Sequence, residues 1–377
     1  MKTTTLILTI ALAGSLACCA SARSAPEKER PIDLVICLDT SNSMDGLINA
    51  AKQKLWDIVN ELAKAKPKPH LRVALYAYGT PAFGAETGYV RKQIDLTDDL
   101  DAVYAKLTAL VTDGGEEYVA RVVRASVLEQ PWSGEKDALK IIVVAGNEPA
   151  TQDRQFKTAD VCKDAITRGI IVNAIYCGPP TSPEADGWRD VARAADGQFA
   201  CIDQDRGTIV VSTPFDQKLA ALGGEINRTY LPYGSRASEG KALQGAADMS
   251  AMAASPAVFA SRAVAKASGQ YRNASWDLVD AMGRKDFDLA KVRKEELPAD
   301  MQAMTLDQRR AHLDAMAKKR ASLQRQIIQL SAQRQKFIDD ELKRNGKSDD
   351  KAFDAAMLRA IREQATRKNF EFEKLAR

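Results

Sequence analysis

Oxygen-bearing side chains occupy alternate positions in one short stretch near the start of the chain, at Asp39, Ser41 and Ser43. An apolar run over 32–38 precedes them, and apolar residues at helical spacing follow from residue 46. We therefore expect a turn between a buried strand and a helix, at the sheet edge where open α/β sheets bind ligands. Carboxylate and hydroxyl oxygens suit Mg²⁺, whereas an ordinary helix cap needs only one such residue.

Strand and helix patterns alternate in the part of the chain that follows. The predicted strands are 32–38, 71–78, 90–96, 139–144, 170–177 and 198–202, and the predicted helices are 46–65, 98–110, 117–129, 153–168, 184–195 and 214–228. Strand segments such as 141–144 are continuous apolar runs, as expected of parallel strands covered on both faces. The pattern predicts an α/β fold with a doubly wound, mostly parallel sheet over residues 32–230.

No strand signal recurs after Tyr230. Residues 231–256 are rich in Gly, Ser, Ala and Pro and are predicted to be a linker, and residues 257–377 are predicted to be helical. Thr305 and Gln308 form a capping-box signature that opens a long helix, and a last helix follows Asn345-Gly346. Charged residues interrupt the apolar positions of the long helix, which favours an antiparallel hairpin packed on itself over an uninterrupted coiled coil.

The N-terminus reads as an export signal. A basic start and an apolar segment over 6–17 predict a signal peptide at residues 1–22, followed by a flexible leader over 23–31. Cleavage can follow Ala20-Ser21-Ala22, or Cys18 can be lipidated, since 15–18 resembles a lipobox. The expectation is an exported protein that is either periplasmic or a membrane-tethered lipoprotein, with a lipid as its only membrane contact.

The cysteines and the charge distribution indicate which disulfide, metal and nucleic-acid interactions to expect. Cys177 and Cys201 end successive predicted strands and are a candidate disulfide, the alternative being buried thiols. Without a CxxC pair a zinc site is not expected. The net charge is +4, and residues 281–377 carry 23 Lys and Arg against 16 Asp and Glu. These charges are interspersed, which indicates a solvated helical face and no nucleic-acid partner.

The strand, the Asp-x-Ser-x-Ser turn, the helix and the alternating pattern to Ile202 together resemble the von Willebrand factor A (VWA) domain. The resemblance covers roughly residues 32–205. It implies a Rossmann-like fold with a metal-ion-dependent adhesion site (MIDAS), in which Asp39, Ser41 and Ser43 hold Mg²⁺, or Mn²⁺ or Ca²⁺. It also implies that an acidic side chain of a partner protein completes the coordination.

Two further loops of this family contribute to the site, and both differ here. The second loop, often Gly-Gly-Thr, reads Gly114-Gly115-Glu116, and the third, often Thr-Asp-Gly, has Gly146 at the Asp position. We expect Glu116 to supply the second carboxylate in place of the missing Asp. The residues expected to support the site from nearby are Thr112, Asn147 and Glu148.

The sequence favours binding over catalysis. His70 and His312 lie in no motif with a nucleophile, and no Gly-x-Ser-x-Gly elbow is present, so no enzyme activity is expected. The first hypothesis is an exported, metal-dependent protein-binding module of the cell envelope. The alternative is a metal-free scaffold whose C-terminal helices carry the interaction. The sequence leaves the oligomeric state open.

Overall fold

The structure is a computed structural model that describes residues 29–202, 212–344 and 348–372. The predicted signal peptide over 1–22, with Cys18, and residues 23–28 of the predicted leader lie outside these residues. The described ranges contain no helix with the length and apolarity that a membrane crossing requires.

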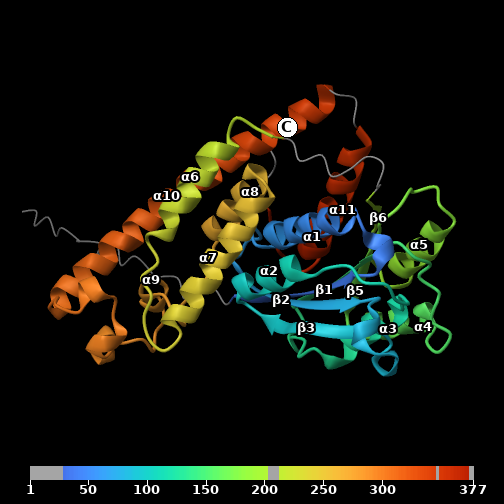
Figure 1. The fold of residues 1–377 in the computed structure, drawn as a ribbon, viewed down its shortest axis with the longest axis horizontal. Helices are drawn as coiled ribbons and strands as arrows, with labels where there is room; N and C mark the ends of the chain where they lie inside the picture. The colour runs from blue at the N-terminus through green and yellow to red at the C-terminus, as the bar shows by residue number, and fades with distance from the viewer. Residues whose placement is uncertain (1–28, 203–211, 345–347, 373–377) are drawn as a thin grey trace, which may run out of the picture.

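A six-stranded sheet forms the centre of the α/β domain (Figure 1). Its strands are β1 (Arg30–Asp39), β2 (Pro69–Tyr78), β3 (Val90–Thr97), β4 (Leu139–Gly146), β5 (Ile170–Tyr176) and β6 (Phe199–Cys201). The order is β3-β2-β1-β4-β5-β6, and β3 alone is antiparallel to its neighbour. The doubly wound, mostly parallel sheet predicted from the sequence is confirmed.

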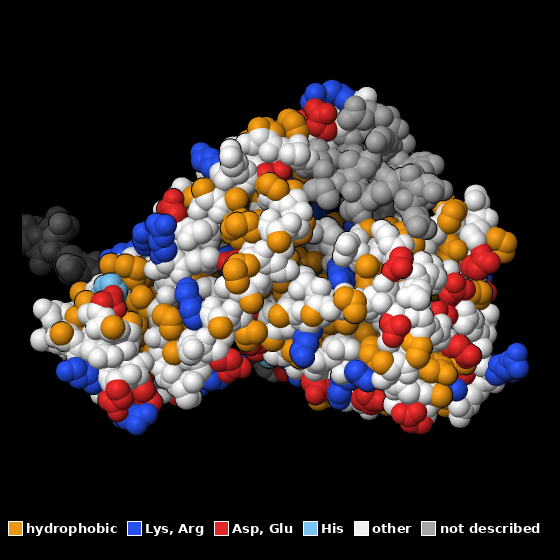
Figure 2. Space-filling model, in the orientation of Figure 1, with side chains coloured by type: hydrophobic (Ala, Val, Ile, Leu, Met, Phe, Trp, Pro, Cys, Tyr) orange, Lys and Arg blue, Asp and Glu red, His pale blue; other side chains and the backbone are white. Residues whose placement is uncertain are grey.

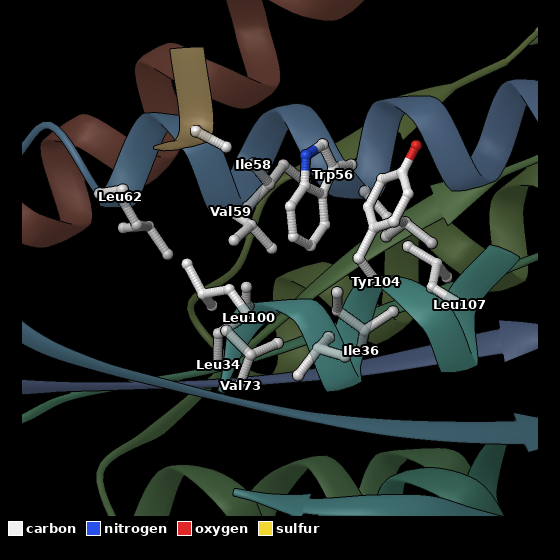
Figure 3. Packing of buried hydrophobic residues seen from close by; sticks show 14 of the residues in the cluster. Leu34, Ile36, Trp56, Ile58, Val59, Leu62, Val73, Leu100, Tyr104 and Leu107 are labelled. Atoms are coloured by element: carbon white, nitrogen blue, oxygen red, sulfur yellow. The ribbon is translucent and has the colours of Figure 1, made fainter. Parts of the chain in front are cut away.

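Helices cover both faces of this sheet. One face carries α1 (Ile48–Leu62) and α2 (Leu100–Ala109), and the other carries α3 (Val119–Glu129), α4 (Thr158–Thr167) and α5 (Glu184–Ala194). Alternate residues of β1 serve the two cores, with Ile36 on the α1 face and Val35 on the α3 face. Figure 3 shows the α1 face, where Trp56 and Tyr104 meet edge to face with ring centroids 4.7 Å apart.

The second half of the chain is helical. Its helices are α6 (Asp216–Asn227), α7 (Ala237–Ala254), α8 (Pro256–Ala267), α9 (Leu278–Ala281), α10 (Leu306–Arg344) and α11 (Ser348–Thr366). Short 3₁₀ turns occur at 42–44, 81–83, 85–87, 289–291, 294–296 and 299–301. Helix α6 packs against α8 and α10 (Figure 1), so the helical region begins before the boundary predicted near Tyr230. Helical periodicity in the sequence identified α6 but not the surface that it covers.

The predicted linker over 231–256 is mostly the helix α7, which packs against α8 and α2. Its small residues allow close packing. A Cβ on Gly240 would overlap the Trp276 ring, so the indole lies directly against the helix backbone. Composition rich in Gly and Ala therefore marked a tight helix contact at this place and not a flexible connection.

The predicted hairpin also requires correction, because α10 and α11 bury their apolar residues against different partners. Helix α10 lies along α6 and α8, whereas α11 turns back to cover α1 and β6 (Figure 1). Gln364 of α11 exchanges two hydrogen bonds with buried Asn173 of β5, at 3.1 and 2.8 Å. Arg362 pairs with Glu61 of α1. The last helix thus completes the α/β domain, and residues 216–344 form an insertion within it.

Two buried ionic clusters hold the inserted helices. In the first, Arg262 of α8 pairs with Asp101 of α2 and Asp248 of α7, and Lys266 lies 2.7 Å from Asp248. Burial alone would raise the pKa of Asp248, but Lys266 and Arg262 outweigh it and hold that pKa below its usual value. Each buried carboxylate of this cluster therefore has a cation supplied by the chain.

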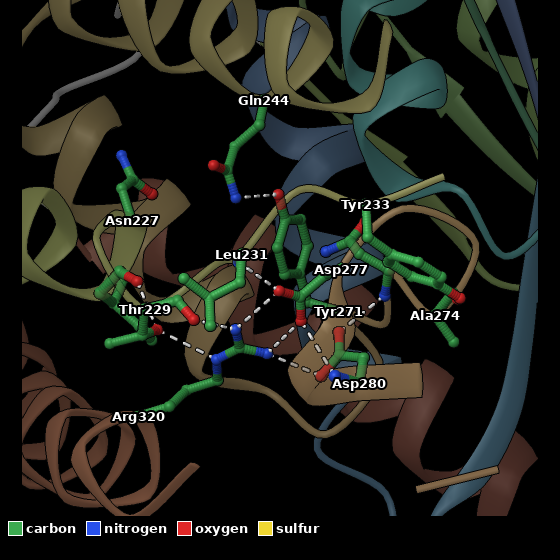
Figure 4. A network of polar contacts seen from close by, with 12 residues as sticks. Asn227, Thr229, Leu231, Tyr233, Gln244, Tyr271, Ala274, Asp277, Asp280 and Arg320 are labelled. Carbon is green, nitrogen blue, oxygen red and sulfur yellow. Dashed lines mark hydrogen bonds and ion pairs between the residues drawn. The ribbon is translucent and has the colours of Figure 1, made fainter. Parts of the chain in front are cut away.

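The second cluster centres on Arg320 of α10 (Figure 4). Its guanidinium donates to Asp277 at 2.7 Å and to Asp280 at 2.8 Å, and to the hydroxyl of Thr229 at 3.0 Å. It also lies over the ring of Tyr230, 3.9 Å from the centroid. Arg320, which interrupts the apolar positions of α10, is thus the residue that ties this helix to the segments around α9.

The candidate disulfide between Cys177 and Cys201 is absent, and the four cysteines of the described residues are thiols. Strands β5 and β6 pair so that Tyr176 lies opposite Cys201. Cys177 therefore packs in the core of the α1 face and Cys201 against the core of the α3 face. Side chains of successive strand residues point to opposite faces, which keeps the two sulfur atoms apart.

Candidate metal site

Strand β1 ends at Asp39, and the chain turns at once into a 3₁₀ turn before α1. The main-chain N–H of Ser41 donates to Asp39 Oδ1 at 2.8 Å, and the hydroxyls of Ser41 and Ser43 lie 2.8 Å apart. Asp39 and Ser41 are buried, whereas Ser43 faces solvent. The structure therefore brings the three predicted oxygen donors together at the carboxyl edge of the sheet.

The loop after β4 joins them through Asn147. Ser43 donates to Asn147 Oδ1 at 3.0 Å, and the Asn147 amide donates back to the main-chain oxygen of Ser43 at 2.9 Å. The neighbouring Glu148 is close enough for its charge to raise the pKa of Glu117. Thr112, in contrast, donates to Asp45 at the outer side of the first loop.

Glu117 lies beside Asp39, in the place that the sequence analysis assigned to Glu116. The side chain of Glu116 is exposed and accepts a hydrogen bond from the Tyr118 hydroxyl. A Cβ on Gly79 would stand 2.7 Å from Asp39 Oδ1 and 3.1 Å from Glu117 Cγ, so both side chains approach the same point. Gly79 has a φ of +86°, which favours glycine.

A pattern in the sequence distinguishes the two glutamates. Val119, the first residue of α3, is buried, and residues two apart in an extended segment point the same way. Glu117 therefore shares the inward direction of Val119, whereas Glu116 points outward. Glu116 was predicted because it follows Gly114-Gly115, where the family has Thr, and this match takes no account of the alternation of side chains.

Gly146 occupies the position where the family has an acid, and the structure explains the glycine. A Cβ there would overlap the Tyr78 hydroxyl and stand 3.0 Å from Asp39 Oδ2. The Tyr78 hydroxyl donates to the main-chain oxygen of Ala145 at 3.0 Å, which fixes the ring. The buried tyrosine thus takes the space that a third-loop carboxylate would need.

The electrostatics of the site are unbalanced. Burial raises the pKa of Asp39 to about 7; hydrogen bonds from Ser41 lower it, the charge of Glu117 raises it, and a longer approach of the Asn147 main-chain N–H lowers it slightly. Burial also raises the pKa of Glu117. Asp39 Oδ2 is buried and has no hydrogen-bond partner among the described residues. Within the same residues, neither carboxylate forms a salt bridge with a Lys or Arg.

No family model and no curated protein matches the chain. Among solved structures, the chain is similar to BatB from Bacteroides thetaiotaomicron, with 15% identity over 46% of this chain and 94% of that chain and a TM-score of 0.36. It is also similar to the SpRpn10 VWA domain, with 16% identity over 46% of this chain and 88% of that chain and a TM-score of 0.35. A third similar structure is proximal thread matrix protein 1 from the mussel byssus, solved with a zinc-occupied MIDAS motif. Its identity is 13% over 47% of this chain and 43% of that chain, with a TM-score of 0.36. The α/β domain itself is a doubly wound, six-stranded sheet.

The donors at this edge of the sheet suit a small hard cation. They are the carboxylates of Asp39 and Glu117, the hydroxyls of Ser41 and Ser43, and the amide oxygen of Asn147. Mg²⁺ takes oxygen ligands, keeps several waters and needs only one or two carboxylates. Nowhere in the described ranges do three or more His, Cys, Asp or Glu cluster as a metal site, so the set depends on hydroxyl and amide oxygens.

Proposed function

We propose that this protein is a metal-ion-dependent protein-binding module of the cell envelope. One observation carries the proposal: Asp39 Oδ2 is buried without a partner, beside Glu117 and with no salt bridge to a Lys or Arg. An uncompensated buried charge is costly, and proteins relieve it by taking up a proton, by pairing or by binding a metal. A divalent cation beside Asp39 supplies the missing positive charge.

In this proposal Asp39, Ser41 and Ser43 hold Mg²⁺, or Mn²⁺ or Ca²⁺, at the carboxyl edge of the sheet. The bound ion supplies a positive charge with exchangeable water ligands. A partner protein then binds by placing an acidic side chain on the ion, so its affinity depends on the metal. Export rests on the signal-like sequence of residues 1–22.

Isothermal titration of the purified protein with Mg²⁺ and with Mn²⁺ tests the metal site. Wild type is expected to bind one ion, and Asp39→Ala to lose binding. Asp113→Ala is the matched control, since it removes an exposed carboxylate from the loop before α3. Absence of binding in wild type, or binding that survives Asp39→Ala, contradicts the proposal.

A metal-free scaffold remains the second candidate because of apolar side chains on the helical region. Met249 and Met252 of α7 are 68% and 60% exposed, and Ile328 of α10 is 51% exposed. Figure 2 shows apolar side chains at the surface over α7 and α8. If this surface carries the interaction, Met249→Asp with Met252→Asp abolishes capture of envelope proteins, and EDTA leaves capture unchanged. The metal-dependent module predicts the opposite pair of results.

A further inference from the structure

The position of Glu117 bears on how the proposed site is regulated. We propose that Glu117 is an internal ligand of the cation that competes with the acidic group of a partner. This inference rests on the proposed function. It assigns to one residue of the chain the role of keeping the site closed until a partner displaces it.

The first support is that Glu117 and Asp39 converge. Both approach the same point above Gly79, and the side chain of Ser41 is within hydrogen-bonding reach of both carboxyl groups. Gly79 leaves this point open, because any Cβ there would collide with Asp39 Oδ1. A cation held by Asp39 and Ser41 therefore has the Glu117 carboxylate next to it.

The second support is that the loop carrying Glu117 is fixed. Its Asp113 N–H donates to the Thr40 main-chain oxygen at 2.9 Å. Gly115 lies so close to Gly79 that a Cβ would overlap the Gly79 oxygen. Glu117 itself is only 8% exposed and has Gln152 within hydrogen-bonding reach. The carboxylate is thus held at the site in the absence of any partner.

The third support is the charge balance. Two carboxylates neutralise one divalent cation, so an ion shared by Asp39 and Glu117 exerts no net attraction on a third carboxylate. Glu148 adds a further negative charge nearby. Like charges repel more strongly where water is excluded than at an exposed surface. A partner's acid is therefore expected to bind only when Glu117 moves off the ion.

Tb³⁺ luminescence on the full chain tests this inference, with acetate as the probe for a partner's carboxylate. Lifetimes in H₂O and D₂O count the waters on the ion. The Glu117→Gln variant is expected to bind Tb³⁺ about 10- to 100-fold more weakly than wild type. It is also expected to carry about one additional water on the ion. Acetate should displace more water from Tb³⁺ in this variant, where one carboxylate leaves the ion two net positive charges, than in wild type, where two carboxylates leave it one.

Glu116→Gln is the matched control, because it removes the same charge from the adjacent, outward-facing residue. Near-ultraviolet circular dichroism confirms that both variants fold. Wild-type affinity and hydration in Glu117→Gln overturn this inference and leave the metal site intact. Equal losses of Tb³⁺ affinity in Glu117→Gln and Glu116→Gln also overturn it, because they show that the negative charge of the loop attracts the ion and that Glu117 is not a ligand. A wild type that binds neither Tb³⁺ nor Mg²⁺ overturns the proposed function, and this inference with it.

Discussion

Two regions of this molecule treat their buried carboxylates differently. In and around the inserted helices, Asp101, Asp248 and Asp277 each pair with a buried Arg or Lys. At the carboxyl edge of the sheet, Asp39 and Glu117 approach each other without such a pair. In the inserted helices, the chain itself supplies the cation, as Arg or Lys. At the carboxyl edge of the sheet, the cation is expected to come from solution.

The largest effect is expected from Arg262→Ala, which leaves Asp101 and Asp248 buried without their shared cation. Breaking a buried ion pair in this way costs about 3–5 kcal/mol of unfolding free energy. Urea unfolding followed by circular dichroism measures it. If the loss of unfolding free energy is as small as that for an exposed ion pair, the buried ion pairs do not hold the inserted helices. Arg293→Ala, which removes an exposed pair with Glu296, is the control.

The next largest effect is expected at the pair of buried amide side chains Asn173 and Gln364, which hydrogen-bond to each other. Gln364→Ala removes both hydrogen bonds to Asn173 and leaves its buried NH₂ group without a partner, while its oxygen still accepts from the Gln198 main-chain N–H at 2.7 Å. The expected loss is about 1–3 kcal/mol in the same urea assay. The double variant Asn173→Ala with Gln364→Ala should recover only part of it, because the orphaned NH₂ group is gone but the Gln198 main-chain N–H loses its acceptor. If the single variant costs nothing, α11 does not complete the α/β domain as described.

The pH dependence of stability should separate the two regions. In EDTA, folded Asp39 with a pKa of about 7 binds a proton that the unfolded chain, with a carboxyl pKa near 3.8, does not. Stability from this group therefore rises as the pH falls from about 7 toward 4. The groups facing it are Glu117, Tyr78 and Cys177. For Asp248, whose pKa is lowered, stability is lost as the pH falls below its ordinary value.

Thermal unfolding across this pH range measures both trends. Mg²⁺ should weaken the rise toward pH 4, because protons and cation compete for the same carboxylates. Asp39→Asn should remove the rise and keep the loss at lower pH. A rise that persists unchanged in Asp39→Asn would assign it to another group and weaken the contrast between the regions.

The smallest effect is expected from Asp39→Asn at pH 8 in EDTA. Replacing an uncompensated buried charge by an amide of the same shape should stabilise the fold by about 1 kcal/mol. The gain is limited because the new NH₂ group needs a partner of its own. The same change should abolish stabilisation by Mg²⁺, measured as a shift in melting temperature. A destabilised variant would indicate that Asp39 is compensated after all.

The sequence predicted those features that depend on local pattern. The apolar run before Asp39 and the alternating oxygen donors after it located the turn and its three donors. Continuous apolar runs located the strands of a mostly parallel sheet, whereas the order of the strands came from the structure. These features depend on neighbours in sequence, so spacing alone reveals them.

The errors arose where a residue's partner is distant in sequence. Helical periodicity found α6 and α11 but could not show that α6 joins the insertion and α11 the sheet. Cys177 and Cys201 end neighbouring strands, yet a register offset of one residue places them on opposite faces. Gly146 could not be explained without the Tyr78 ring, which comes from another strand.

The return of α11 to the sheet has a consequence for synthesis. Arg362 reaches Glu61 across 301 positions, and Arg30 donates to the Asn369 main-chain oxygen across 339. Contacts between residues so far apart are formed late, since the intervening chain must first exist. On a ribosome, strands β1 to β6 emerge long before the helix that covers part of their surface. The apolar face beneath α11 therefore stays uncovered until the last helix has emerged and packed against it.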